Sequence, residues 1–198
     1  MAESLLPRRT ERLVLRTFAY GDEADVLAYR GRDDVCRYIP PDPVTADDVT
    51  EFIAERVEAG QLRADGDRMA LAVVLDDRVI GDVLVRAGRL ADRQAEIGWV
   101  INPEFQRRGF ATEAAAELLA MAFGDLAMHR VWAQLDPRNA ASTRVCERLG
   151  LRLEGHLRED MWLKGRWCDC MIYAILRPEW AAAAGLVTPG LEGAGPAS

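Results

Sequence analysis

The stretch Ile97-Gly98-Trp99-Val100-Ile101-Asn102-Pro103-Glu104-Phe105-Gln106-Arg107-Arg108-Gly109-Phe110-Ala111-Thr112 is the segment around which the chain is organised. Its apolar beginning predicts a strand, and the alanine-rich residues from Thr112 to Phe123 predict a helix. The basic loop between them places two arginines at a helix N-terminus, where backbone N–H groups lack partners and the helix dipole is positive. Gly109 lets the backbone come close to a ligand. We interpret this loop as a cradle for a pyrophosphate group.

The loop alone leaves a simpler interpretation open. A strand, a loop with one glycine and a helix occur in many α/β proteins, and loop arginines are often only solvated. Two familiar nucleotide-binding loops can be excluded. The loop has no Gly-Lys-Ser/Thr ending, so it is not a Walker loop, and its single glycine does not make the dinucleotide fingerprint.

Length and composition indicate one globular domain. The chain has 198 residues, of which 49% are hydrophobic and 29% are charged. A net charge of −7 argues against a general affinity for nucleic acid or an acidic membrane. No apolar run approaches the ~18 residues that a membrane span needs, and residues 1–9 lack the apolar core of a signal peptide. We therefore expect a cytoplasmic monomer or homodimer with no nucleic-acid or membrane partner.

Cysteine spacing argues against disulfides and metal. The four cysteines are Cys36, Cys146, Cys168 and Cys170. They form neither a disulfide framework nor a CxxC pair. Cys168 and Cys170 would share one face of a strand, but a structural zinc site needs four nitrogen or sulfur ligands, and the chain adds only His129 and His156. We expect free thiols and no bound metal.

Patterns along the rest of the chain predict alternating strands and helices. Strands are expected at residues 11–18, 68–75, 79–85, 94–101, 130–135, 151–161 and 167–176. Helices are expected at residues 23–30, 45–59, 111–123 and 140–149, with Asp22 and Thr45 as caps of the first two. The proline-rich residues 32–43 predict a loop or short turns. Residues 94–135 then form a β–α–β crossover, whose ligand would lie where the basic loop is, beyond the strand ends.

Several segments agree, in type and order, with one known family. They are Glu11–Arg16, Gln106–Ala114, Asp136–Ser142, Leu149–Leu151, and the residues Trp167, Asp169, Tyr173 and Ala174. Together they resemble the GCN5-related N-acetyltransferase (GNAT) superfamily and, within it, the RimJ/RimL-like branch. The likeness covers residues 10–180. Residues 1–9 would be an N-terminal extension, and residues 181–198 a tail whose composition predicts disorder.

The resemblance implies an α/β fold with a mixed, mostly antiparallel seven-stranded sheet and about four helices. The sheet would splay between its fourth and fifth strands, residues 94–101 and 130–135, and acetyl-CoA would lie in this wedge as cosubstrate. The residues that would bind it are Trp99, Val100 and Ile101 along the pantetheine arm, Gln106, Arg107, Arg108, Gly109, Phe110, Ala111 and Thr112 around the pyrophosphate, and Asn139 and Ser142 at the next helix start.

Acetyl transfer needs a deprotonated amine, a polarised thioester and a partner for the leaving thiolate. Glu96 is the first candidate for the base, although it is equally suited to a surface ion pair; Gln134, where other members carry a base, cannot serve as one. The acid stays open. Cys146 stands where the superfamily usually has a tyrosine, and Ser142 matches a serine suspected in the RimJ/RimL-like branch or simply caps its helix. A third possibility is that no acid is needed.

The acceptor implied by the resemblance is a primary amine. A peptide N-terminal amine, as in ribosomal-protein acetylation, is the first hypothesis. A small amine, such as a polyamine, an amino acid derivative or an antibiotic, is the second, and a non-catalytic acyl-CoA-binding domain is the third. Glu159, Asp160 and Asp169 are candidates to line the amine pocket, and Trp162 and Trp167 to wall it, although aromatic residues on strands more often pack in a core.

Overall fold

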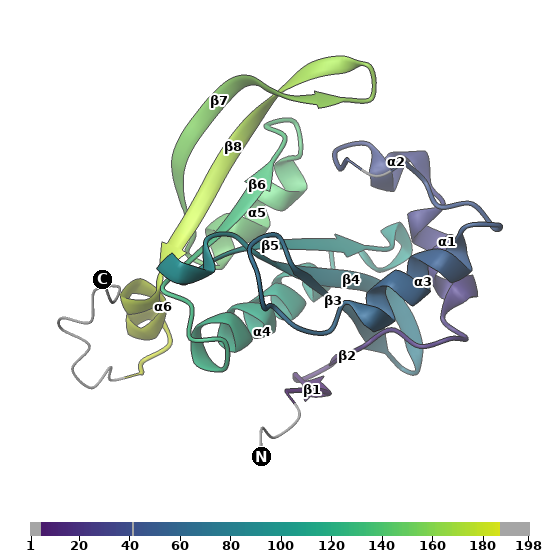
Figure 1. Cartoon of the computed structure of the whole chain (residues 1–198), viewed down its shortest axis with the longest axis horizontal. Helices are drawn as coiled ribbons and strands as arrows, with labels where there is room; N and C mark the ends of the chain where they lie inside the picture. Colours follow the sequence, from purple (N-terminus) through teal and green to yellow (C-terminus); the bar gives the residue numbers. More distant parts are fainter. Residues whose placement is uncertain (1–4, 41, 187–198) are drawn as a thin grey trace.

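The computed structural model describes residues 5–40 and 42–186 (Figure 1). Its elements are β1 (Arg8–Arg9), β2 (Val14–Arg16), α1 (Glu23–Arg30), α2 (Asp33–Cys36), α3 (Val49–Glu58), β3 (Arg68–Leu75), β4 (Arg78–Ala87), β5 (Gln94–Ile101), α4 (Phe110–Gly124), β6 (Arg130–Leu135), α5 (Ala140–Arg148), β7 (Arg152–Leu163), β8 (Arg166–Leu176) and α6 (Arg177–Ala183). Two 3-10 turns, η1 (Leu90–Asp92) and η2 (Pro103–Phe105), flank β5.

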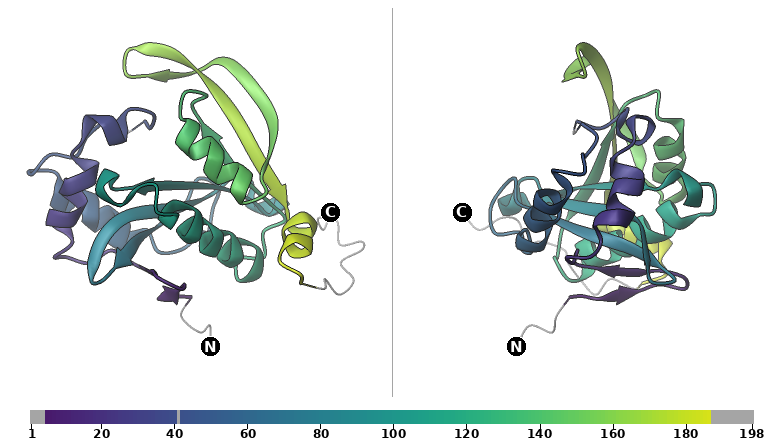
Figure 2. Two further views of the ribbon diagram at one scale, coloured as in Figure 1. Left: turned by 180° about the vertical axis from the view of Figure 1, so that it is seen from behind. Right: turned by 90° about the vertical axis from the view of Figure 1, so that its right-hand side faces the viewer.

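The described strands form one mixed sheet in the order β1-β2-β3-β4-β5-β6-β8-β7. Every neighbouring pair is antiparallel except β5 and β6, which are parallel because α4 carries the chain across between them. Helices α4 and α5 lie on one face, and α1 and α3 on the other (Figure 2). The two central strands β3 and β4 are therefore buried on both faces.

The α/β class and the splayed sheet are confirmed, with corrections to the counts. Residues 5–40 and 42–186 contain eight strands instead of seven, because the residue pair Arg8–Arg9 adds a short strand beside β2. The same part of the chain contains six α-helices instead of about four. The two additional helices are α2, inside the proline-rich segment, and α6, directly after β8. Both are short, and neither has the apolar periodicity that identifies longer helices.

The start of α3 was also predicted too early. Thr45 does not open the helix. Its hydroxyl donates to the Asp48 carboxylate at 2.5 Å, which closes a turn, and the helix begins only at Val49. Such local side-chain bonds compete with helix formation.

Helix α6 follows β8 and packs against the rest of the fold. The predicted end of the domain, residue 180, lies inside this helix. Trp180 stacks on Phe123 of α4 with ring centroids 5.2 Å apart, and Ala181 is buried. These contacts explain why residues 181–183 are helical, although the composition of the segment predicts disorder. The remainder of the predicted tail, residues 187–198, lies outside the described residues. Within the described ranges, no helix has the length and apolar character that crossing a membrane requires.

The splay lies between β5 and β6. Only three residues of β5 pair with β6: Gln94, Ala95 and Glu96. Beyond them, residues 97–101 pair with β4 alone and residues 133–135 with β8 alone. The β7–β8 hairpin, whose ladder is interrupted by register shifts, bends away from the rest of the sheet (Figure 1). The result is a wedge between the carboxyl halves of the two parallel strands.

We predict that Gly88 is required for the closed end of this wedge. A Cβ atom there would lie 2.1 Å from the Trp132 ring, whereas a Cβ at Gly98 would meet nothing within 4 Å. Gly88→Ala should therefore lower the free energy of unfolding by about 1–3 kcal/mol, the usual cost of overpacking. Gly98→Ala is the matched control and should cost nothing measurable. Urea denaturation of both variants checks this, and equal losses would contradict it.

Candidate active site

The free edge of β5 forms one wall of the wedge. Residues 97–101 bond β4 on one side and have no partner strand on the other. Trp99 and Val100 are half-buried there, and Ile101 is buried against α4. An unpaired strand edge can receive an extended ligand through backbone hydrogen bonds. This edge contains the three residues predicted to bind the pantetheine arm.

The turn between β5 and α4 is held by side chains. The Gln106 amide donates to the carbonyl of Ile101 at 2.9 Å, and Asn102 accepts from the N–H of Glu104 at 3.1 Å. Gln106 thus braces the end of β5, a role that the sequence did not indicate. Arg107 and Gly109 both have positive φ, +61° and +86°. These values turn the backbone sharply before the helix starts.

The N-terminus of α4 is open to an anion. The first intrahelical bond runs from the N–H of Glu113 to the carbonyl of Gly109, so the N–H groups of residues 110–112 have no acceptor in the described chain. Ala111 and Thr112 are half-buried, and the loop before them is exposed. The residues predicted to hold a pyrophosphate therefore lie together at one helix end.

Arg107 and Arg108 carry the positive charge of this loop. Both are exposed, and neither forms an ion pair with any described carboxylate. The Arg108 guanidinium lies over the Phe110 ring, 4.9 Å from its centroid. This contact orients the side chain without neutralising its charge.

The first turn of α4 contains one acidic residue, Glu113, and the negative charge of its carboxylate is balanced by the neighbouring Arg12. Glu113 accepts from the backbone N–H and the guanidinium of Arg12 at 2.9 and 2.7 Å and from the Thr10 hydroxyl at 2.5 Å. Burial raises the pKa of Glu113, but these bonds and the charge of Arg12 outweigh it, so the pKa lies below its ordinary value. Arg12 also donates to the carbonyl of Arg108 at 3.1 Å. No local pattern in the sequence indicates this clamp, because its partners are about 100 residues apart.

The start of α5 lies on the other wall. The Asn139 side chain accepts from the N–H of Ser142 at 3.1 Å and so caps the helix. The Ser142 hydroxyl has no hydrogen-bond partner in the described chain and is half-buried. Before the helix, the buried Asp136 accepts from the backbone and guanidinium of Arg138 at 2.9 and 2.8 Å. Asn139, and not Ser142, is therefore the cap, and the Ser142 hydroxyl is free for another role.

Glu96 lies at the apex of the wedge. It is the last residue of β5 in register with β6, and its carboxylate is 3.5 Å from the guanidinium of Arg86. Its side chain is 25% exposed. Burial raises the pKa of Glu96 above its ordinary value, and the charges of Arg86 and Arg68 oppose this only in part. The next position on the same strand face is Gly98, which leaves open space beside the carboxylate.

Cys146 belongs to the core and not to the site. It is fully buried among apolar side chains, and burial raises the pKa of its thiol to about 12. All four cysteines are free and buried, as predicted for free thiols. Cys170 of β8 lies near Gln134 of β6, and Glu96 contributes to its electrostatic surroundings. No group of three or more described His, Cys, Asp and Glu side chains is arranged to hold a metal ion.

Asp169, Trp162 and Trp167 of the β7–β8 hairpin have their contacts within the hairpin. Asp169 bonds His156 at 2.8 Å and accepts from the backbone N–H of Glu159 at 3.0 Å. Trp162 and Trp167 are 60% and 57% exposed and pack edge-to-face, 5.3 Å apart. The structure thus brings Glu96, Gln134 and Cys170 into one neighbourhood, while these hairpin side chains mainly contact one another.

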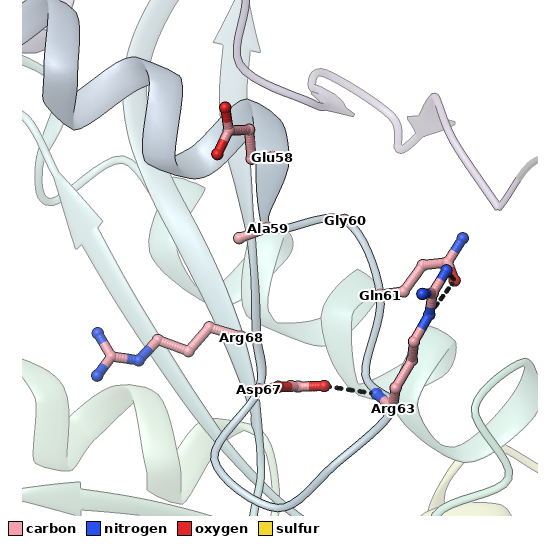
Figure 3. Close-up of a pocket in the computed structure, with 7 residues that line it drawn as sticks. All are labelled: Glu58, Ala59, Gly60, Gln61, Arg63, Asp67 and Arg68. Carbon is pink, nitrogen blue, oxygen red and sulfur yellow. Dashed lines mark hydrogen bonds between the residues drawn. The ribbon is translucent and has the colours of Figure 1, made fainter.

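A separate pocket of about 420 Å³ opens at the end of α3 (Figure 3). It is lined by Glu58, Ala59, Gly60, Gln61, Arg63, Asp67 and Arg68. Asp67 accepts from the backbone N–H of Arg63 at 2.7 Å, and the Arg68 side chain points away from both (Figure 3). None of the predicted cosubstrate-binding residues lines it.

Comparison with known proteins places this architecture in one family. Residues 12–152 match the family described as an acetyltransferase (GNAT) domain. The chain is 31% identical over 171 residues to the uncharacterised N-acetyltransferase YnaD of Bacillus subtilis. This alignment covers 86% of this chain and 97% of YnaD. It is also 31% identical over 117 residues to YdaF of the same organism, provisionally named a ribosomal N-acetyltransferase, covering 59% of this chain and 64% of YdaF.

Comparison with a solved structure also indicates the GNAT family. The GNAT-family acetyltransferase of Bacillus anthracis superimposes with a TM-score of 0.79 at 31% sequence identity. The match covers 88% of this chain and 100% of that one. The likeness therefore extends over nearly the whole described fold.

We predict different effects on stability for the two residues at the start of α5. Asn139→Ala removes the cap and should lower the free energy of unfolding by about 1 kcal/mol. Ser142→Ala removes a hydroxyl that bonds nothing and should leave stability unchanged. Urea denaturation of the two variants provides the check. A loss for Ser142→Ala as large as that for Asn139→Ala would show that the serine contributes to the cap.

Proposed function

The chain belongs to the GNAT acetyltransferase family and is an acetyl-CoA-dependent N-acetyltransferase, and we propose that its acceptor is the N-terminal amine of a peptide or protein. The observation that carries the proposal is the open space at Gly98, directly beside the half-buried Glu96. An amine placed there would lie within the wedge, next to a carboxylate whose pKa is raised. The partial likeness to YdaF favours a peptide as its carrier.

The rim of the acceptor side favours a slender substrate. Lys164, at the turn of the β7–β8 hairpin, bonds Asp42 at 2.8 Å. Arg138, before α5, lies over the Tyr38 ring at 5.7 Å from its centroid. Two contacts thus connect the segment between α2 and α3 with the opposite wall. A chain terminus can pass below such a bridge more readily than a side chain that projects from a folded surface.

The cosubstrate would be held by the residues that the fold brings to the wedge. The N–H groups of residues 110–112 and the side chains of Arg107 and Arg108 would bind the pyrophosphate. The free edge at Trp99–Ile101 would bond the pantetheine arm, and the Asn139 amide N–H₂ group, whose oxygen is used in the cap, would donate to it. Gln106 would act by bracing the loop.

Proton transfer would depend on Glu96 and Ser142. The acceptor amine must lose a proton before it attacks, and a carboxylate with a raised pKa is a stronger base than an ordinary one. Glu96 would take this proton directly or through one water. The free Ser142 hydroxyl would donate a hydrogen bond to the leaving thiolate. Cys146 is sealed in the core and would take no part.

A thiol-release assay with acetyl-CoA and a panel of amines tests the proposed acceptor. The panel contains short peptides with free N-termini, the same peptides with blocked N-termini, polyamines, amino acid derivatives and aminoglycosides. Turnover confined to free N-termini is expected. Efficient turnover of polyamines or other small amines would move the function to the second class. Saturable acetyl-CoA binding without any turnover would indicate a binding domain.

We predict that Glu96→Gln changes the pH profile as well as the rate. At pH 7 the kcat/KM should fall by about 10²-fold, the usual contribution of a general base. The deficit should shrink as pH rises, because the α-ammonium group, with a pKa of about 8, then loses its proton to the solvent without help from Glu96. Glu154→Gln is the control, since Glu154 is a strand glutamate in a surface ion pair with Arg130. Identical pH profiles for wild type and Glu96→Gln would remove Glu96 from the role of base.

The free energy of unfolding of Glu96→Gln distinguishes loss of a base from misfolding of the variant. A raised pKa means that ionisation of Glu96 is harder in the folded state, so the group favours folding below its unfolded pKa. That contribution is lost as pH rises through the folded pKa. Glu96→Gln should therefore not lower the free energy of unfolding at pH 7–8.

We predict that the two loop arginines contribute to cosubstrate affinity. The double variant Arg107→Gln/Arg108→Gln should weaken acetyl-CoA binding at least tenfold, since hydrogen bonds to charged groups contribute about 1.5–3 kcal/mol each. The salt dependence of the Kd should become shallower, because fewer charges face the phosphates. Calorimetry at two ionic strengths measures both. The control is Arg89→Gln, an exposed arginine paired with Asp92. An unchanged Kd and salt slope would rule out the pyrophosphate cradle.

A further inference from the structure

Arg56, in the last turn of α3, is buried in part without a full set of partners. Its Nε is the one side-chain nitrogen or oxygen, among the atoms the structure describes, that is buried and has no hydrogen bond. A buried unsatisfied donor is costly and rare in native proteins, so it calls for an explanation such as a missing ligand. The side chain keeps 19% of its surface exposed, and the guanidinium is therefore accessible at an opening.

The contacts of Arg56 fix its orientation but do not neutralise it. The guanidinium carbon lies 3.2 Å from the centre of the Phe52 ring, and Nη1 donates to the Phe52 carbonyl at 2.9 Å. Among the described carboxylates, only that of Glu55 comes within ion-pair distance, at 3.9 Å, and its side chain is 71% exposed. An exposed pair at this distance contributes little. Nη2, which has no hydrogen bond among the described residues and is not buried, is left to bind something else.

The buried carboxylate nearby cannot take this role, because its acceptor sites are used. Asp82 accepts from the Tyr29 hydroxyl at 2.8 Å and from two nitrogens of Arg30, at 2.9 Å for Nε. Asp82 therefore forms no hydrogen bond with Arg56 and acts on it only through its charge. Burial and the charge of Arg30 lower the pKa of Arg56, and Asp82 opposes them only in part. The cluster holds an excess positive charge.

This charge lies on the face of the sheet that carries Glu96. Asp82 on β4 is in register with Val100 on β5, and Val100 and Phe52 pack at the rim of the same apolar cluster. Glu96, Gly98 and Val100 alternate onto one face of the strand. Four residues of strand separate Glu96 from Val100, which is about 13 Å. An acceptor above Gly98 would therefore have Glu96 near one end and Arg56 near the other.

We propose that Arg56, backed by Phe52, binds a carboxylate of the acceptor, on the order of 10 Å from the amine that is acetylated. The proposal rests on the function proposed above and narrows its substrate class. An extended peptide spans about 3.3–3.6 Å per residue, so the carboxylate would belong to an acidic side chain at the second or third residue, or to the C-terminus of a tripeptide. A polyamine would instead bring a second cation toward Arg56.

Peptide pairs that differ only in Asp or Asn test the proposal. Tetrapeptide amides with Asp or Asn at the second or third position are compared as acceptors with wild type, Arg56→Gln and Arg56→Lys. Wild type should favour Asp over Asn in kcat/KM by about tenfold at one position, since a charged hydrogen bond contributes about 1.5–3 kcal/mol. Arg56→Gln should abolish the preference, and Arg56→Lys should keep part of it.

Two controls exclude indirect effects. Arg63→Gln removes an exposed guanidinium that bonds only Gln61, and it should keep the full Asp preference. Arg56→Gln also removes the hydrogen bond and the stacking on Phe52, so urea denaturation verifies that it folds, and its acetyl-CoA affinity should equal that of wild type. If the Gln variant does not fold, Arg56→Lys still reports, because it keeps the charge but loses the planar, stacked donor group.

Binding measured by calorimetry separates this proposal from the proposed function. Absence of turnover with every amine would remove the acetylation of N-termini, while an Asp-over-Asn difference in peptide Kd that Arg56→Gln abolishes would still support the carboxylate site. Turnover of peptides with no Asp preference would overturn the site and leave the function intact. A preference that survives in Arg56→Gln would overturn it as well.

Discussion

The three-residue parallel pairing of β5 with β6 is the constraint on which the rest of this structure depends. Pairing at Gln94–Glu96 holds the two halves of the sheet together, and its absence beyond Glu96 opens them. The backbone that would otherwise bond a neighbouring strand is left free along residues 97–101. An open edge of this kind normally invites aggregation. Here it lies inside a wedge between two helix-covered half-sheets, where an extended ligand can satisfy it.

Both ends of the wedge are held by contacts between segments distant in sequence. At the open end, Arg12 binds Glu113 and the carbonyl of Arg108, so the turn between β1 and β2 positions the loop that begins α4. At the closed end, the ring of Trp132 fills the space above Gly88. These contacts leave the N–H groups of the first helical turn without acceptors, beside two arginines that pair with no described carboxylate, and they place Glu96 where burial raises its pKa.

The two faces of β5 serve different parts of the proposed reaction. One face packs on α4 and belongs to the side where the cosubstrate would lie, while the other carries Glu96, Gly98 and Val100 toward α1 and α3. The charges on that second side are unequal, since Arg30 bonds both oxygens of Asp82 and Arg56 has no hydrogen bond to it. A family that acetylates many amines needs a variable surface for the acceptor, and an incompletely paired arginine offers this chain one means of selecting it.

Local signals in the sequence predicted the periodic elements and the basic loop before an alanine-rich helix, and its short motifs indicated the family. The sequence predicted β3, β5 and β6 to the residue, and missed α2 and α6, which form through tertiary contacts such as Trp180 on Phe123. Three features follow from tertiary contacts alone: Gln106 braces a strand, Cys146 is sealed in the core, and Nε of Arg56 is buried without a hydrogen-bond partner. Burial and pairing join residues far apart in the chain, and no local pattern records them.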